Sequence, residues 1–112
     1  MTELTAQVEH QEGISIIRIV GYLSSEHASP LEEAFQQIGD VEKVLLVFQE
    51  GDFITSAGLA VLFDLILPLK EEQGKEFRIV QPSRHFRKIF DIIGLSQDVG
   101  VFEVEEQAVV GW

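Results

Sequence analysis

One segment, residues 44–62, constrains the fold more than any other part of the chain: VLLVFQEGDFITSAGLAVL. It opens with a continuous apolar run from Val44 to Phe48, a pattern typical of a strand that is buried on both faces. A polar turn follows, and the tetrapeptide Thr55-Ser56-Ala57-Gly58 then leads into a second apolar stretch with helical spacing. The segment therefore predicts a strand, a loop and a helix, with two hydroxyl side chains at the amino end of the helix.

These two hydroxyls, on Thr55 and Ser56, have two interpretations. The amino end of a helix presents unpaired N–H groups and the positive pole of the helix dipole. A hydroxyl there can cap the helix, which is worth about 1 kcal/mol. It can also be exposed enough for a kinase to reach it. The sequence leaves both interpretations open.

Apolar periodicity predicts alternating strands and helices along the rest of the chain. Strands are expected at residues 4–8, 14–20, 44–48, 77–80 and 99–102, with the first two forming an antiparallel hairpin. A first helix is expected to begin between Glu26 and Pro30, where Ser29-Pro30 favours the later start with Ser29 as N-cap, and to stop at Gly39. A second is expected from about Gly58 to Gln73, with Gly74 as the stop. A third is expected after Ser83, and a short one within residues 103–110. The core face of the third helix comprises Phe86, Ile89, Phe90 and Ile93, before an ending at Gly94-Leu95.

This order of elements predicts an α/β fold in one domain over residues 1–112. We expect a mixed, mostly parallel sheet of about five strands, with an N-terminal antiparallel hairpin and helices packed on the sheet. In such sheets, ligands and partners tend to meet the loops at the carboxyl ends of the strands. The loop from Asp52 to Ser56 occupies that place.

Composition excludes several classes of function. The net charge of −11 argues against nucleic acid and against anionic membrane surfaces, and it favours a protein partner with a basic or mixed face. The absence of cysteine rules out disulfides and thiolate metal sites, and it is compatible with the cytoplasm. We expect no signal peptide and no membrane-spanning segment.

Motifs that would indicate catalysis, a metal or a cofactor are missing from the sequence. The three histidines lie far apart, none at metal-ligand spacing with a carboxylate. There is no glycine-rich phosphate loop, and Ser56 does not lie in a nucleophile elbow. The chain is therefore expected to be neither an enzyme nor a binder of metals or cofactors.

The quoted segment, followed by FRIV and by PSRHFRKIFDIIGL, resembles the STAS domain of bacterial anti-sigma-factor antagonists. Upstream, IIRIVGYLSSEHASPLEEAF resembles the second strand and first helix of that family, so the likeness covers nearly the whole chain. The resemblance implies partner switching. The unphosphorylated protein binds an anti-sigma factor that is also a serine kinase, phosphorylation of a loop serine ends the binding, and a phosphatase restores it.

The resemblance also implies which residues form the site. The phosphorylated serine lies two positions before the motif's glycine, which places it at Ser56, with Thr55 as the alternative acceptor. Thr55 and Ser24 stand where the family usually carries aspartates. The residues expected to bind the partner are Gly21, Ser24, Asp52, Phe53, Thr55, Ser56, Ala57, Gly58 and Ala60.

Two other functions stay open at this stage. STAS-like proteins also serve as non-phosphorylated accessory subunits of membrane lipid-transport ATPases, and the loss of both loop aspartates is compatible with that role. A nucleotide-sensing STAS module is the third alternative. As for assembly, the exposed first strand could pair with another copy, whereas the negative charge opposes it, so we expect a monomer or a weak homodimer.

Overall fold

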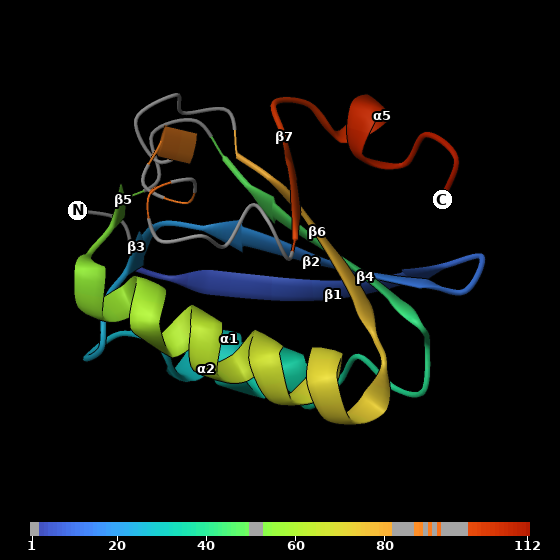
Figure 1. The fold of residues 1–112 in the computed structure, drawn as a ribbon. Helices are drawn as coiled ribbons and strands as arrows, with labels where there is room; N and C mark the ends of the chain where they lie inside the picture. Colours follow the sequence, from blue (N-terminus) through green and yellow to red (C-terminus); the bar gives the residue numbers. More distant parts are fainter. Residues whose placement is uncertain (1–2, 50–52, 82–86, 89, 91, 93–98) are drawn as a thin grey trace.

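A five-stranded sheet forms the centre of the computed structural model, which describes the chain except for residues 1–2, 50–52, 82–86, 89, 91 and 93–98 (Figure 1). The strands lie in the order β1-β2-β4-β6-β7. They span Thr5–Gln11 (β1), Ile14–Val20 (β2), Lys43–Phe48 (β4), Glu76–Val80 (β6) and Gly100–Phe102 (β7). β1 pairs antiparallel with β2, and the other neighbours in the sheet pair in parallel. The predicted mixed, mostly parallel sheet with an N-terminal hairpin is confirmed.

The hairpin of β1 and β2 turns through only two residues. Glu12 and Gly13 both have positive φ, at 48° and 82°, which is the pattern of a type I′ turn. Such a turn matches the right-handed twist of the strands it joins. The turn therefore fixes the register, in which Gln11 lies opposite Ile14.

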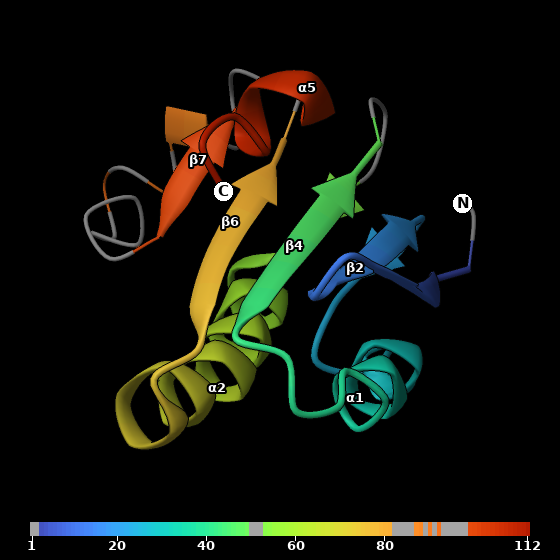
Figure 2. The same ribbon diagram turned by 90° about the vertical axis from the view of Figure 1, so that its right-hand side faces the viewer.

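Two helices cover one face of the sheet, as Figure 2 shows. They are α1 (Ser29–Phe35) and α2 (Ser56–Gln73). Ile17, Leu46 and Ile79 are paired across β2, β4 and β6, and all three are fully buried in the main core. Burying each such side chain is worth about 1.5–3 kcal/mol, so this layer is the main source of stability.

The opposite face of the sheet carries a smaller apolar cluster and the short helix α5 (Glu105–Ala108). Arg18 on β2 donates two hydrogen bonds to Glu105, at 2.9 and 3.0 Å, and a third to Glu9 at 2.9 Å. The hydrogen bonds to Glu105, and to a smaller extent the one to Glu9, raise the pKa of Arg18 above its ordinary value. Arg78 on β6 donates to the Ala108 carbonyl at 2.9 Å, and its guanidinium stacks on Trp112, with Cζ 4.7 Å from the ring centroid. Two arginines thus hold residues 105–112 against this face.

The boundaries of the helices differ in part from the prediction. The assignment of Ser29 as N-cap is wrong, since the cap is Ala28, whose carbonyl accepts hydrogen bonds from the N–H groups of residues 31 and 32, and Ser29 is the first helical residue. α1 also ends at Phe35, earlier than the expected stop at Gly39. α2 starts at Ser56, two residues before the expected Gly58.

Other boundaries agree with the prediction or cannot be compared with it. Gly74 ends α2 in the left-handed conformation, with φ of 68°, as expected. Ser83 and the Gly94-Leu95 ending lie outside the described residues, as do Phe86, Ile89 and Ile93 of the third predicted helix. Phe90 of that helix is fully buried. In the described part of the chain, no helix has the length and apolar character needed to cross a membrane.

Candidate functional site

Two very short strands hold the loop that precedes α2. β3 (Tyr22–Leu23) and β5 (Phe53–Ile54) pair in parallel as a separate two-stranded sheet (Figure 1). The N–H of Thr55 donates to the Leu23 carbonyl at 3.0 Å, which continues the pairing beyond β5. Because Leu23 and Ile54 are buried, the pair ties the amino end of α2 to the main core.

Thr55 is the N-cap of α2. It has extended backbone angles, and its Oγ1 accepts a hydrogen bond from the N–H of Gly58 at 2.9 Å. Its hydroxyl also donates to the Leu23 carbonyl over a longer distance of 3.5 Å. The capping interpretation therefore belongs to Thr55, whose oxygen accepts the hydrogen bond from the Gly58 N–H.

Ser56 is the first residue of α2 and is exposed. Among the described residues its hydroxyl has no hydrogen-bond partner. Ala57 and Ala60 are also exposed, so the amino end of α2 offers a surface of small side chains around the Ser56 hydroxyl. This hydroxyl is open to solvent and to another protein.

Gly58 lets the first turn of α2 approach β3 closely. A Cβ atom at this position would lie 2.4 Å from the carbonyl oxygen of Leu23 and 3.1 Å from the Cα of Ser24. Both neighbours are backbone atoms, which cannot move aside as a flexible side chain can. Any residue other than glycine would therefore displace either the helix or the loop after β3.

Ser24 lies beside this contact and is only 8% exposed. Its Oγ is buried and has no hydrogen-bond partner among the residues that the structure describes. A buried polar atom left unpaired costs about 1–3 kcal/mol, so an unpaired buried hydroxyl is uncommon. Gly21, three residues earlier, is buried with a φ of 110°, a conformation that favours glycine.

The comparison with protein families decides which family this fold and loop represent. The family model of the STAS domain matches residues 5–108. The chain belongs to the STAS domain family. No curated protein matches the sequence.

Solved structures share the fold of this STAS domain at low sequence identity. An anti-sigma factor antagonist from Mycobacterium paratuberculosis is 21% identical with a TM-score of 0.74, over 96% of this chain and 92% of that chain. The phosphorylated form of SpoIIAA, a Bacillus cell fate determinant, is 24% identical with a TM-score of 0.65, over 95% of this chain and 97% of that chain. The unphosphorylated form of the anti-sigma factor antagonist SpoIIAA is 18% identical with a TM-score of 0.65, over 95% of this chain and 94% of that chain. These likenesses show a common fold.

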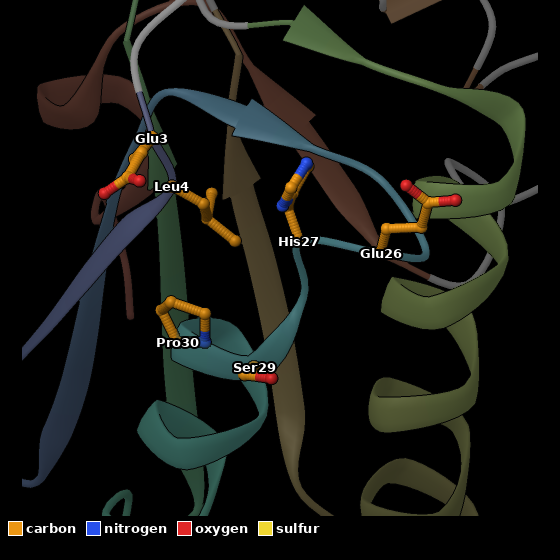
Figure 3. Close-up of a pocket in the computed structure, with 6 residues that line it drawn as sticks. All are labelled: Glu3, Leu4, Glu26, His27, Ser29 and Pro30. Atoms are coloured by element: carbon orange, nitrogen blue, oxygen red, sulfur yellow. The ribbon is translucent and has the colours of Figure 1, made fainter.

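The STAS domain also has a pocket close to the amino end of α2, between the start of β1 and the loop that enters α1 (Figure 3). Its volume is 240 Å³, and its lining residues are Glu3, Leu4, Glu26, His27, Ser29 and Pro30. Leu4 forms a buried floor, and Figure 3 shows Glu3 and Glu26 on opposite sides. His27 packs edge-on against Tyr22 of β3 at 6.0 Å, which links the pocket to the β3–β5 pair. The pocket therefore presents an apolar floor between two carboxylates.

The predicted site residues of the STAS domain fall into two layers. Thr55, Ser56, Ala57 and Ala60 lie at the surface, at least partly exposed, whereas Gly21, Ser24 and Gly58 lie buried beneath them. Asp52 lies outside the described residues, and for Phe53 the structure describes only the backbone in β5. Among the described residues, no group of three metal-binding side chains is present.

Sequence reasoning missed the pocket and the pairing of β3 with β5. The pocket residues come from separate segments that carry no motif. The two strands contain two residues each, which is too short for a periodic pattern. The only sequence signal was the pair of apolar dipeptides Tyr22-Leu23 and Phe53-Ile54, which directly flank the loops of the site.

Proposed function

We propose that this STAS domain is an anti-sigma-factor antagonist that acts by partner switching in the cytoplasm and is not itself an enzyme. The unphosphorylated protein binds an anti-sigma factor that is also a serine kinase, and thereby frees a sigma factor. Phosphorylation of Ser56 ends this binding, and a phosphatase restores it. The observation that carries the proposal is the division of roles between adjacent hydroxyls. Thr55 caps α2, which leaves the exposed Ser56 hydroxyl available for modification.

The docking face that we propose lies around the amino end of α2. It comprises Gly21, Ser24, Asp52, Phe53, Thr55, Ser56, Ala57, Gly58 and Ala60. Exposed small side chains at Ala57 and Ala60 let another protein approach the helix closely. Gly58 supports this surface from below, because its lack of a side chain lets α2 pack against the backbone of Leu23 and Ser24.

A phosphate on Ser56 would disturb the complex far more than the free domain. It adds a charge of about −1.5 to −2 at neutral pH. In the free protein, the exposed position and the helix dipole offset this charge, the dipole by roughly 0.3–1 kcal/mol. In a complex that covers Ser56, the charge loses its water, and an uncompensated buried charge costs on the order of 3–5 kcal/mol. One phosphate can therefore reduce the affinity by two or more orders of magnitude while the fold is kept.

The pocket next to the docking face indicates the charge of the partner. Glu3 and Glu26 face it, and among its described lining residues none is Lys or Arg. The whole chain carries a net charge of −11. An anti-sigma factor with a basic surface would be attracted to this side of the domain and guided to the docking face.

The test is to incubate the protein with ATP and its cognate serine kinase and to measure its intact mass. We expect the addition of one phosphoryl group, which is absent in Ser56→Ala and retained in Thr55→Val. The phosphorylated protein should bind the kinase at least about 100-fold more weakly than the unmodified one. Phosphorylation that persists when both hydroxyls are removed would eliminate Ser56 and Thr55 from the mechanism.

A second function follows from the identity of residues 24 and 55, which are Ser24 and Thr55 instead of the family's usual aspartates. If no kinase recognises this loop, the same docking face could hold a membrane lipid-transport ATPase permanently. The two functions differ in their response to ATP. An accessory subunit would co-purify with an ATPase whether or not ATP is present, and its Ser56→Glu variant would be the only form that is released.

A further inference from the structure

A second groove lies on the α5 side of the sheet, away from α1 and α2. Its volume is 490 Å³, which is within the range of ligand sites. Its lining residues are Gln11, Glu12, Ile14, Ile16, Glu105, Glu106 and Val109. Ile14 and Ile16 belong to the apolar cluster on this face of the sheet, and Val109 is 38% exposed. The floor is therefore apolar and partly open to solvent.

The rim of this groove carries carboxylates that are not neutralised within the protein. Glu105 is engaged by two hydrogen bonds from Arg18. Glu12, in the hairpin turn, and Glu106, in α5, are exposed and make no ion pair with any described residue. They lie on different elements, so two free negative charges border one apolar floor.

The groove is separate from the proposed docking face. It lies at the Ile14 end of β2, whereas β3 and the amino end of α2 follow the Val20 end. The seven residues of β2 span about 20 Å at roughly 3.3 Å per residue. Two of its lining residues, Glu105 and Glu106, belong to α5, and α5 lies on the face of the sheet opposite to α2 (Figure 2). A partner in the groove would therefore not touch Ser56.

We propose that this groove binds a segment of a partner protein in which basic residues flank an apolar residue. The apolar side chain would pack on Ile14, Ile16 and Val109, and the two cationic side chains would pair with Glu12 and Glu106. The argument is charge complementarity, since the apolar contact alone would admit many segments while the two free carboxylates select a basic one. This binding does not depend on the phosphorylation state of Ser56.

A second copy of this chain fits the groove less well. The chain has 8 Lys and Arg residues against 19 Asp and Glu residues, so two copies repel each other. Its densest basic stretch includes Arg87, which is already paired with Glu103. The occupant we propose is therefore a different protein.

A segment bound here would act as a tether. If the same partner also uses the docking face, the tether keeps it close after that contact is broken, which raises its effective concentration for rebinding. Loss of the phosphate would then restore the complex faster than free diffusion allows.

The test uses the full chain labelled with ¹⁵N and three synthetic peptides at low ionic strength. The first peptide is acetyl-Ala-Arg-Leu-Arg-Ala-amide, the second replaces Leu with Ser, and the third replaces both Arg with Glu. We expect the first peptide to shift the amide signals of Ile14, Ile16 and Val109, and to leave those of residues 56–60 unchanged. The second should bind several-fold more weakly, and the third should not bind.

Matched variants locate the binding and can overturn the proposal. The double variant Glu12→Gln, Glu106→Gln should weaken the first peptide about tenfold, since each exposed ion pair contributes up to about 1 kcal/mol. Glu32→Gln, Glu33→Gln removes the same charge from exposed positions on α1 and should change little. Equal weakening by both variants, equal binding of the Ser peptide, or shifts centred on residues 56–60 would each refute the groove. A dimer in sedimentation analysis that Glu12→Gln, Glu106→Gln dissociates would show that a second copy is the occupant, and would refute the partner we propose.

Discussion

The two adjacent hydroxyls at the amino end of α2 should make very different contributions to stability. Thr55→Val keeps the shape of the side chain and removes the oxygen that accepts from the Gly58 N–H at 2.9 Å. The extended backbone of Thr55, with φ of −84° and ψ of 165°, suits valine, so the substitution introduces no strain. The second bond of this hydroxyl, to Leu23 at 3.5 Å, is too long to contribute much. The expected loss is therefore that of one N-cap, about 1 kcal/mol.

Ser56→Ala is the matched control. Its hydroxyl has no partner among the described residues, and alanine is the better helix former by a few tenths of a kcal/mol. The free energy of unfolding should therefore stay the same or rise slightly. Urea unfolding, followed by far-ultraviolet circular dichroism, measures both variants. With an m-value of about 1–2 kcal/mol per M, the midpoint for Thr55→Val should fall by roughly 0.5–1 M.

Two results would refute this reasoning. If Ser56→Ala lowers the midpoint as much as Thr55→Val does, then Ser56 is a capping residue, and its hydroxyl is not free for a kinase. An unchanged midpoint for Thr55→Val would show that the 2.9 Å contact does not stabilise the helix.

Three further substitutions test other contacts by thermal unfolding. Gly58→Ala should lower the stability by about 1–3 kcal/mol through its clash with Leu23, and stabilisation would show that β3 is not held against α2. Lys75→Met should cost about 1–3 kcal/mol, because the buried ammonium donates to the carbonyls of residues 39 and 41, and a neutral result would contradict that role. Ser24→Ala should leave the stability unchanged or slightly higher, since its buried hydroxyl has no partner among the described residues, and a loss above about 1 kcal/mol would reveal a bond to it.

The main features of the fold could be predicted from the sequence because they depend on local patterns. The run from Val44 to Phe48 is apolar on both faces of the strand, and it forms all of β4 except Lys43, with every residue buried. Gly74 ends α2 because its left-handed conformation favours glycine, which is a property of one residue and its neighbours. Signals of this kind do not depend on the rest of the structure.

The features that the sequence did not reveal depend on contacts between distant segments. The pairing of β3 with β5 goes together with the close approach of Gly58 in α2 to Leu23, and these two residues are 35 positions apart in the sequence. Arg18 and Glu105, which fix α5 on the sheet, are separated by 87 positions. The start of α1 is a different case, since Ala28 and Ser29 are neighbours and both allow a cap. The backbone arrangement after β3, and not the side chain, places the first helical bond on the Ala28 carbonyl.

The stacking of Trp112 on Arg78 has an optical consequence. Trp112 is the sole tryptophan in the sequence, and its indole also donates a hydrogen bond to Glu76. The tryptophan fluorescence of the protein therefore originates on the α5 side of the sheet. Detachment of residues 108–112 should alter that emission, whereas binding at the far end of the domain should leave it constant, so the unlabelled protein distinguishes the two events by itself.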